Sequence, residues 1–139
     1  MRFTRLITTA LLFGLSFTGA APSRAQGEGR PLIVGNTRLL MVRTGDTLLH
    51  GQRMTISQRI NHVQDIFARH LGGQAGRVTW KPIRDRAHLY LNGDFVLAVT
   101  PTDARLNGYK SAAQLAPVWA RALSHGFAEA HVRPAPARP

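Results

Sequence analysis

Apolar residues recur at helical spacing in two parts of the chain. In the first part they follow one another at steps of three or four residues, which is typical of an amphipathic helix; they are Ile56, Ile60, Val63, Phe67 and Leu71. Thr55 precedes this run and Gln58 lies three residues later, as in a capping box, while Gly72-Gly73 follows it. The pattern therefore predicts a helix over residues 56–71 with Thr55 as its N-cap.

The second apolar stripe lies near the C-terminus and is broader. Its members are Leu115, Val118, Trp119, Ala122, Leu123, Phe127 and Ala130. Ser111 is the expected N-cap. Pro117 lacks an N–H group and its ring collides with the carbonyl four residues back, so we expect the helix to kink or restart there.

Alternating and short apolar runs predict strands. Residues 32–34 and 39–42 flank a Gly35-Asn36 turn, and "RVTWKPI" at 77–83 forms another strand. In "AHLYLNGDFVLAVT", apolar positions alternate on both sides of Asn92-Gly93, the residue pair that a type I′ hairpin turn favours. The sequence therefore predicts a tight hairpin centred on Asn92 and Gly93, whereas "GDTLLHGQRM" indicates a loop.

Thr100 and Asp103 form a second capping box, with Pro101 at the first helical position. Asp103 is therefore expected to be a cap carboxylate at the positive end of a short helical turn. Asn107-Gly108 follows, and Gly108 readily takes the left-handed conformation of a helix C-cap.

The order of elements, β-β-α-β-β-β-α, predicts an α+β fold in which two main helices cover one face of an antiparallel sheet of about five strands. We assign residues 32–130 to this single domain. Residues 26–31 form a flexible lead-in, and residues 131–139, "HVRPAPARP", form a disordered Pro/Arg tail with too little apolar surface to pack.

The first 25 residues have the pattern of a secretory signal peptide. Arg2 and Arg5 precede an apolar segment over residues 6–17, and Ala25 precedes the expected cleavage site at Gln26. A retained membrane anchor is the alternative, although the apolar segment is shorter than the ~20 residues that a bilayer span needs. We therefore expect a secreted or periplasmic protein.

Charge and cysteine content narrow the classes of function further. The chain contains no cysteine, which excludes thiol chemistry and thiolate metal sites. Without Arg2, Arg5 and Arg24, 15 of the 18 basic residues remain against 7 acidic ones, a net charge of +8. Such a positive net charge favours anionic partners. For an exported protein, nucleic acid is the least expected of these partners. The alternative explanation of the many arginines is a coding bias that favours Arg codons over Lys codons.

One cluster of basic residues is a candidate anion-binding site. It consists of Arg77, Lys81, Arg84 and Arg86, with Trp80 and Tyr90 nearby as stacking surfaces. Guanidinium groups bind carboxylate and phosphate through charge-assisted, often bidentate hydrogen bonds. The alternative is a solvated loop that keeps a small protein soluble.

Other chemistry has weaker support in the sequence. The six histidines lack the spacing of a metal site, so neither a metal nor another cofactor is expected. No Gly-x-Ser-x-Gly motif occurs, and Ser57 and His62 project from their helix in different directions. A small periplasmic hydrolase that uses His62 or Asp103 remains the alternative function.

A family resemblance rests on the segments "VGNTRLLMV", "SQRINHVQDIFARH", "VTW", "LYLNGDFVLAVTPTDARLNG" and "LAPVWARAL". Together they resemble the soluble extracytoplasmic domain that precedes the membrane part of some bacterial small-conductance mechanosensitive channel proteins. The likeness covers about residues 34–127. The positions that carry it are Val99, Thr100, Asp103, Ala104, Gly108, Ala116 and Trp119.

The resemblance implies a stand-alone sensory or accessory module of the periplasm, because no membrane-spanning segment follows the C-terminal helix. The leading hypothesis is a non-enzymatic module that binds an envelope component, a periplasmic protein or a membrane protein. The sequence indicates neither the ligand nor the oligomeric state.

Overall fold

The computed structural model describes residues 29–45, 47–49 and 51–132, and its α+β class confirms the sequence prediction. The signal peptide, the first part of the lead-in and most of the tail lie outside the described residues. The elements are β1 (Arg30–Val34), β2 (Thr37–Val42), β3 (Thr47–Leu49), β4 (Gln52–Met54), α1 (Ile56–His70), β5 (Val78–Ile83), β6 (Arg86–Leu91), β7 (Asp94–Val99), α2 (Pro101–Leu106) and α3 (Ala112–Val132).

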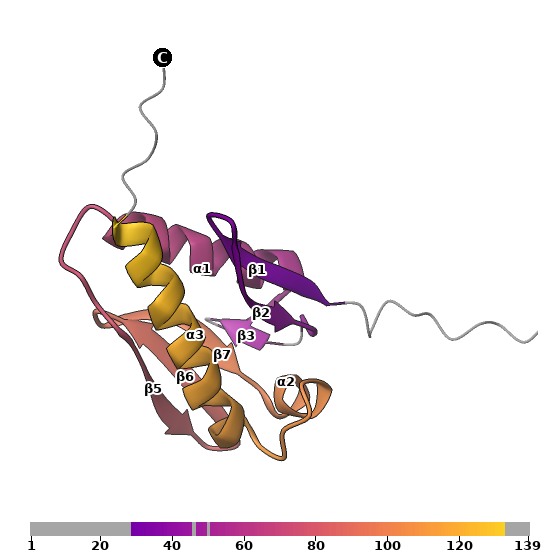
Figure 1. The fold of residues 1–139 in the computed structure, drawn as a ribbon. Helices are drawn as coiled ribbons and strands as arrows, with labels where there is room; N and C mark the ends of the chain where they lie inside the picture. Colours follow the sequence, from indigo (N-terminus) through magenta and orange to yellow (C-terminus); the bar gives the residue numbers. More distant parts are fainter. Residues whose placement is uncertain (1–28, 46, 50, 133–139) are drawn as a thin grey trace, which may run out of the picture.

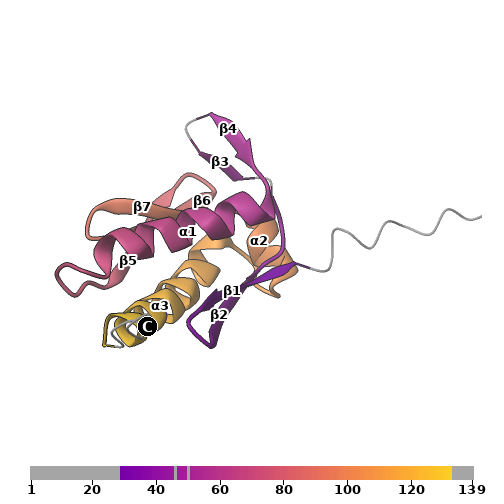
Figure 2. The same ribbon diagram turned by 90° about the horizontal axis from the view of Figure 1, so that it is seen from above.

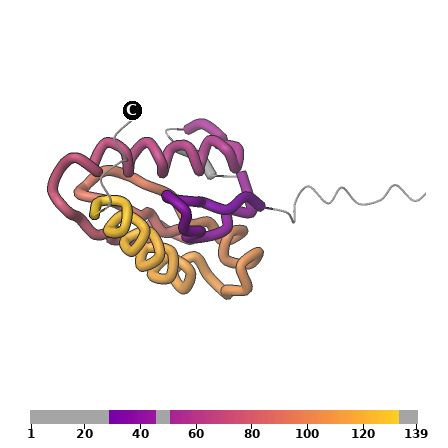
Figure 3. Tube along the Cα trace, turned by 45° about the horizontal axis from the view of Figure 1, so that its top comes forward, coloured from indigo at the N-terminus to yellow at the C-terminus, as the bar shows by residue number. Residues whose placement is uncertain are grey.

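The strands form three antiparallel sheets in place of the single sheet of about five strands that the sequence predicted. β5, β6 and β7 form a three-stranded sheet in that order, whereas β1–β2 and β3–β4 are separate hairpins. α3 packs against β5 and β6, and α1 contacts β7 (Figure 1). The β1–β2 hairpin lies between α1 and α3 (Figure 3), so it fills the space between the helices and does not extend the sheet.

The predicted caps and turns are confirmed. Thr55 and Thr100 both form complete capping boxes, with Gln58 and Asp103 as their partners. Asn92 and Gly93 have φ angles of 51° and 89°, both left-handed, as a type I′ turn requires. Gly108, with φ 82°, follows the last residues of α2 as the expected helix stop.

The core lies where the β1–β2 hairpin, both long helices and the three-stranded sheet meet. Its largest fully buried apolar side chains come from α3, β1 and β6; they are Phe127, Leu32, Leu89, Leu91, Leu115 and Leu123. Phe67 of α1 meets Phe127 of α3 edge to face, with ring centroids 5.3 Å apart. This contact joins the two helices across the centre of the protein.

Side chains contact backbone groups on the two outer strands of the three-stranded sheet. On β5, Ser124 Oγ accepts a hydrogen bond from Val78 N–H at 2.8 Å, and Pro82 has no N–H to offer. On β7, α1 supplies the partners. Arg59 Nη2 donates to Ala98 O at 2.7 Å, and His62 Nε2 lies 3.0 Å from Phe95 O. No strand can pair with β7 along these carbonyl groups, which explains why the sheet ends there.

Four local predictions need correction. The segment expected to be a loop forms the β3–β4 hairpin, which projects on the side away from α3 (Figure 2). Arg30 and Pro31, assigned to the lead-in, begin β1, and His131, assigned to the tail, belongs to α3. α3 also runs through Pro117 as one continuous helix, without the expected restart.

Candidate functional site

The most enclosed charged group in the described part of the chain is a pair formed by Arg59 and Asp103. Their side chains are buried, at 1% and 0% exposure. Arg59 Nη1 donates to Asp103 Oδ1 at 2.9 Å and Nη2 to Oδ2 at 2.8 Å, a bidentate geometry. Arg59 also donates to Thr44 O at 2.6 Å and Ala98 O at 2.7 Å. The pair therefore ties α1, α2, β7 and the segment after β2 together.

Asp103 thus has a second role that the sequence reasoning missed. Its Oδ2 accepts hydrogen bonds from the N–H and the hydroxyl group of Thr100, both at 2.9 Å, while its carboxylate holds Arg59. A side chain that is fully enclosed and engaged in this way cannot contact a substrate. The signal for the pair was available, because Arg59 lies three residues after Ile56 and four before Val63 on the apolar face of α1.

The predicted anion-binding cluster is divided by the structure. Arg84 and Asp85 form the two-residue turn between β5 and β6. Arg77 lies before the opposite end of β5. At about 3.3 Å per strand residue, it is roughly 20 Å from Arg84 along the chain. Lys81, Arg84 and Arg86 therefore stay near one end of the sheet, and Arg77 belongs to another site.

One face of the sheet combines aromatic rings with positive charge. Strand alternation directs Leu89 and Leu91 into the core, so the intervening side chains lie on the face opposite α3. We call this surface the aromatic–basic face; it consists of Lys81, Arg86, His88, Tyr90 and Phe95.

The rings of the aromatic–basic face form a connected group. Phe95 meets His88 and Tyr90 edge to face, with centroids 5.2 Å and 6.1 Å apart, and Lys81 Nζ lies 5.7 Å from the centre of the Tyr90 ring. His62 of α1 continues the row, 5.9 Å from Phe95. Alternation along β6 is the sequence signal that places His88 and Tyr90 together.

Charge on the aromatic–basic face comes from Lys81 and Arg86. Burial lowers the pKa of His88 below its ordinary value of 6.5, and the nearby Arg86 lowers it further. His88 is therefore neutral at pH 7. In the described part of the chain the nearest acid to Arg86 is Asp85, 3.9 Å away and 73% exposed, so the two form only a loose surface ion pair.

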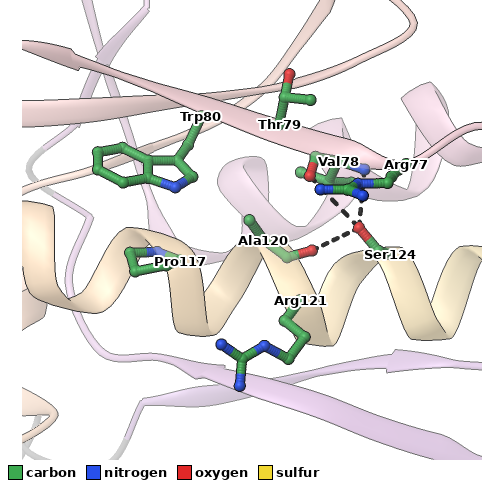
Figure 4. Close-up of a pocket in the computed structure, with 8 residues that line it drawn as sticks. All are labelled: Arg77, Val78, Thr79, Trp80, Pro117, Ala120, Arg121 and Ser124. Carbon is green, nitrogen blue, oxygen red and sulfur yellow. Dashed lines mark hydrogen bonds between the residues drawn. The ribbon is translucent and has the colours of Figure 1, made fainter.

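A second concave site lies between β5 and α3, on the other side of the sheet (Figure 4). This groove has a volume of about 570 Å³. Trp80 and Arg77 approach it from the β5 side, while Pro117, Arg121 and Ser124 belong to α3. Arg121 was not identified from the sequence, since it lies outside the apolar stripe of its helix. Only the fold places Arg121 on the same groove as Arg77.

No protein-family model, curated protein or solved structure matches this chain. The resemblance to the extracytoplasmic domain of mechanosensitive channel proteins therefore stays a prediction. The geometry of the described residues has to carry the functional argument.

In the described ranges, no three histidine or acidic side chains lie close enough together to hold a metal ion. No helix in those ranges is both long and apolar enough to cross a membrane.

Proposed function

We propose that this protein is a non-enzymatic, extracytoplasmic binding module that holds an anionic component of the cell envelope on its aromatic–basic face. The observation that carries the proposal is that Lys81 and Arg86 lie on the same surface as a connected row of rings, with Lys81 over the Tyr90 ring. Acidic polysaccharides fit such a surface chemically. Their carboxylates complement the two cations, and the apolar faces of their sugar rings suit aromatic side chains.

The surface is better suited to a polymer than to a small ion. Lys81 and Ile83 are exposed, and the rings are only half-buried, so each contact is weak by itself. A polymer makes several such contacts at once, which raises the overall affinity without a deep pocket. The enclosure of Asp103 supports a non-enzymatic role, because it removes one of the two residues that a hydrolase was expected to use.

The extracytoplasmic location rests on the predicted signal peptide. If that prediction is right, the protein recovered from the periplasm or the medium begins at Gln26. Cell fractionation followed by intact-mass measurement tests this. Recovery of the full-length chain in the cytoplasm would remove the location from the proposal.

Loss of the two cations is expected to weaken binding about tenfold, the effect of losing about 1.4 kcal/mol. The test is co-sedimentation of the mature protein with purified peptidoglycan sacculi, and titration with an acidic polysaccharide such as alginate. The variant is Lys81→Gln/Arg86→Gln. Binding of the unmodified protein should also weaken between low and physiological salt, since screening reduces attraction between exposed charges.

The matched control is Arg105→Gln/Lys110→Gln, which removes the same charge from exposed positions in and after α2. It should bind within about twofold of the unmodified protein. Equal losses in the two variants would show that net charge, and not the aromatic–basic face, governs binding. Tighter binding to single-stranded RNA or to phosphatidylglycerol vesicles than to either glycan would refute the proposed class of ligand.

A further inference from the structure

The groove between β5 and α3 is separate from the aromatic–basic face, because the two lie on opposite sides of the sheet. Val78 and Trp80 point toward α3, whereas Lys81 points away from it. A ligand in the groove therefore need not touch the surface assigned to the envelope component. The residues that line the groove determine which ligand it binds.

The base of the groove is fixed by hydrogen bonds. Ser124 Oγ accepts from Val78 N–H at 2.8 Å and donates to Ala120 O at 2.7 Å (Figure 4). Because the hydroxyl group already links the helix to the strand, it contributes little to ligand binding. The chemistry of the groove is left to Arg77, Arg121 and the Trp80 indole.

These three side chains offer hydrogen-bond donors and no acceptor. Arg77 and Arg121 are exposed, and neither forms an ion pair within 4 Å with an acidic residue of the described ranges. The groove lining contains no carboxylate. An anion is the ligand that such a donor set satisfies, and guanidinium groups suit the planar carboxylate and the oxygens of phosphate.

The groove also provides an apolar wall. The Trp80 indole lies near Pro117 and Ala120, with Arg121 on the same helix (Figure 4). A volume of about 570 Å³ lies within the range of small-molecule sites, so the groove has room for a ring system in addition to a charged group. A bare ion would leave this apolar wall unused.

We propose that the groove is a binding site for a small organic anion, a flat apolar body that carries a carboxylate or a phosphate group. The ring stacks on Trp80, and the anionic group binds between Arg77 and Arg121.

Titration of the full mature protein with 2-naphthoate and 1-naphthyl phosphate tests the site, with tryptophan fluorescence and calorimetry as readouts. Both probes should quench emission and bind at least tenfold more tightly than neutral 2-naphthalenemethanol or inorganic phosphate. Trp80→Phe should lose most of the quenching, because Trp119, the other tryptophan, is buried at 3% exposure.

The decisive variant is Arg77→Gln/Arg121→Gln, expected to weaken naphthoate binding at least tenfold with an unchanged circular dichroism spectrum and melting temperature. Arg69→Gln/Arg105→Gln removes the same charge from exposed positions on α1 and α2 and should bind normally. Lys81→Gln/Arg86→Gln should also bind normally, which separates this site from the aromatic–basic face.

Three results would overturn the site or its ligand class. They are absence of naphthoate binding, equal affinity for the neutral alcohol or for inorganic phosphate, and equal losses in the groove and control variants. None of them bears on glycan binding by the other face.

Discussion

Asp103→Ala is expected to lower the free energy of unfolding by about 3–5 kcal/mol, the range for removing one partner of a buried ion pair. The substitution leaves the Arg59 guanidinium enclosed without its carboxylate partner. It also removes half of the capping box of α2, because Thr100 N–H donates to Asp103 Oδ2. Urea denaturation followed by circular dichroism measures the loss. Small domains have about 5–15 kcal/mol in total, so we expect the variant to unfold near physiological temperature.

A double variant separates two contributions to this loss. One is the cost of an enclosed charge without a partner, and the other is the loss of attraction between the two charges. In Arg59→Met/Asp103→Leu no charge remains enclosed, so the loss should be smaller than in Asp103→Ala. The native pair is itself not fully compensated, since Arg59 Nε has no hydrogen-bond partner in the described part of the protein. A loss below about 1 kcal/mol in Asp103→Ala would contradict the stabilising role assigned to the pair.

Phe127→Ala is expected to cost about 3–5 kcal/mol, the usual range for truncating a fully buried phenylalanine. The ring is 0% exposed and meets Phe67 edge to face. Its removal leaves a cavity where α1 and α3 meet and takes away an aromatic contact. Thermal and urea denaturation measure the change.

Two controls on the same protein calibrate this loss. Phe127→Leu keeps most of the apolar volume and should cost less than Phe127→Ala. Val118→Ala truncates a side chain of α3 that is 39% exposed and should cost less than about 1 kcal/mol. Similar losses in Val118→Ala and Phe127→Ala would contradict the role assigned to the core contact of Phe127, because alanine is the better helix former at both positions.

The features that the sequence predicted well are those that a few neighbouring residues decide. Asn92-Gly93 forms a type I′ turn because both residues tolerate positive φ angles. Thr55 and Thr100 cap their helices because each has its partner three residues later. Each of these interactions involves only residues within four positions of one another, so no knowledge of the rest of the fold is needed.

Features that depend on distant residues were beyond the sequence. The position of Arg59 on the apolar face of α1 indicated burial, but its partner Asp103 lies 44 residues away and only the fold shows that the two meet. The division into three sheets depends on where α1 packs, since its side chains take the outer carbonyl groups of β7. The candidate sites follow the same rule. Neighbours on one hairpin, such as Lys81 and Arg86, stayed together, whereas the placement of Arg77 and Arg121 on one groove needed the packing of α3 on β5.

The side chains that bind the sheet edges have a consequence for behaviour at high concentration. An open edge strand is a template on which another chain can add, which leads to aggregation or strand exchange. Here Ser124 binds the backbone of Val78 and Pro82 has no N–H on β5, and Arg59 and His62 occupy two carbonyl groups of β7. These contacts hinder growth of the three-stranded sheet at both edges while α1 and α3 remain in place. Edge-to-edge pairing at β7 should require that α1 first detach.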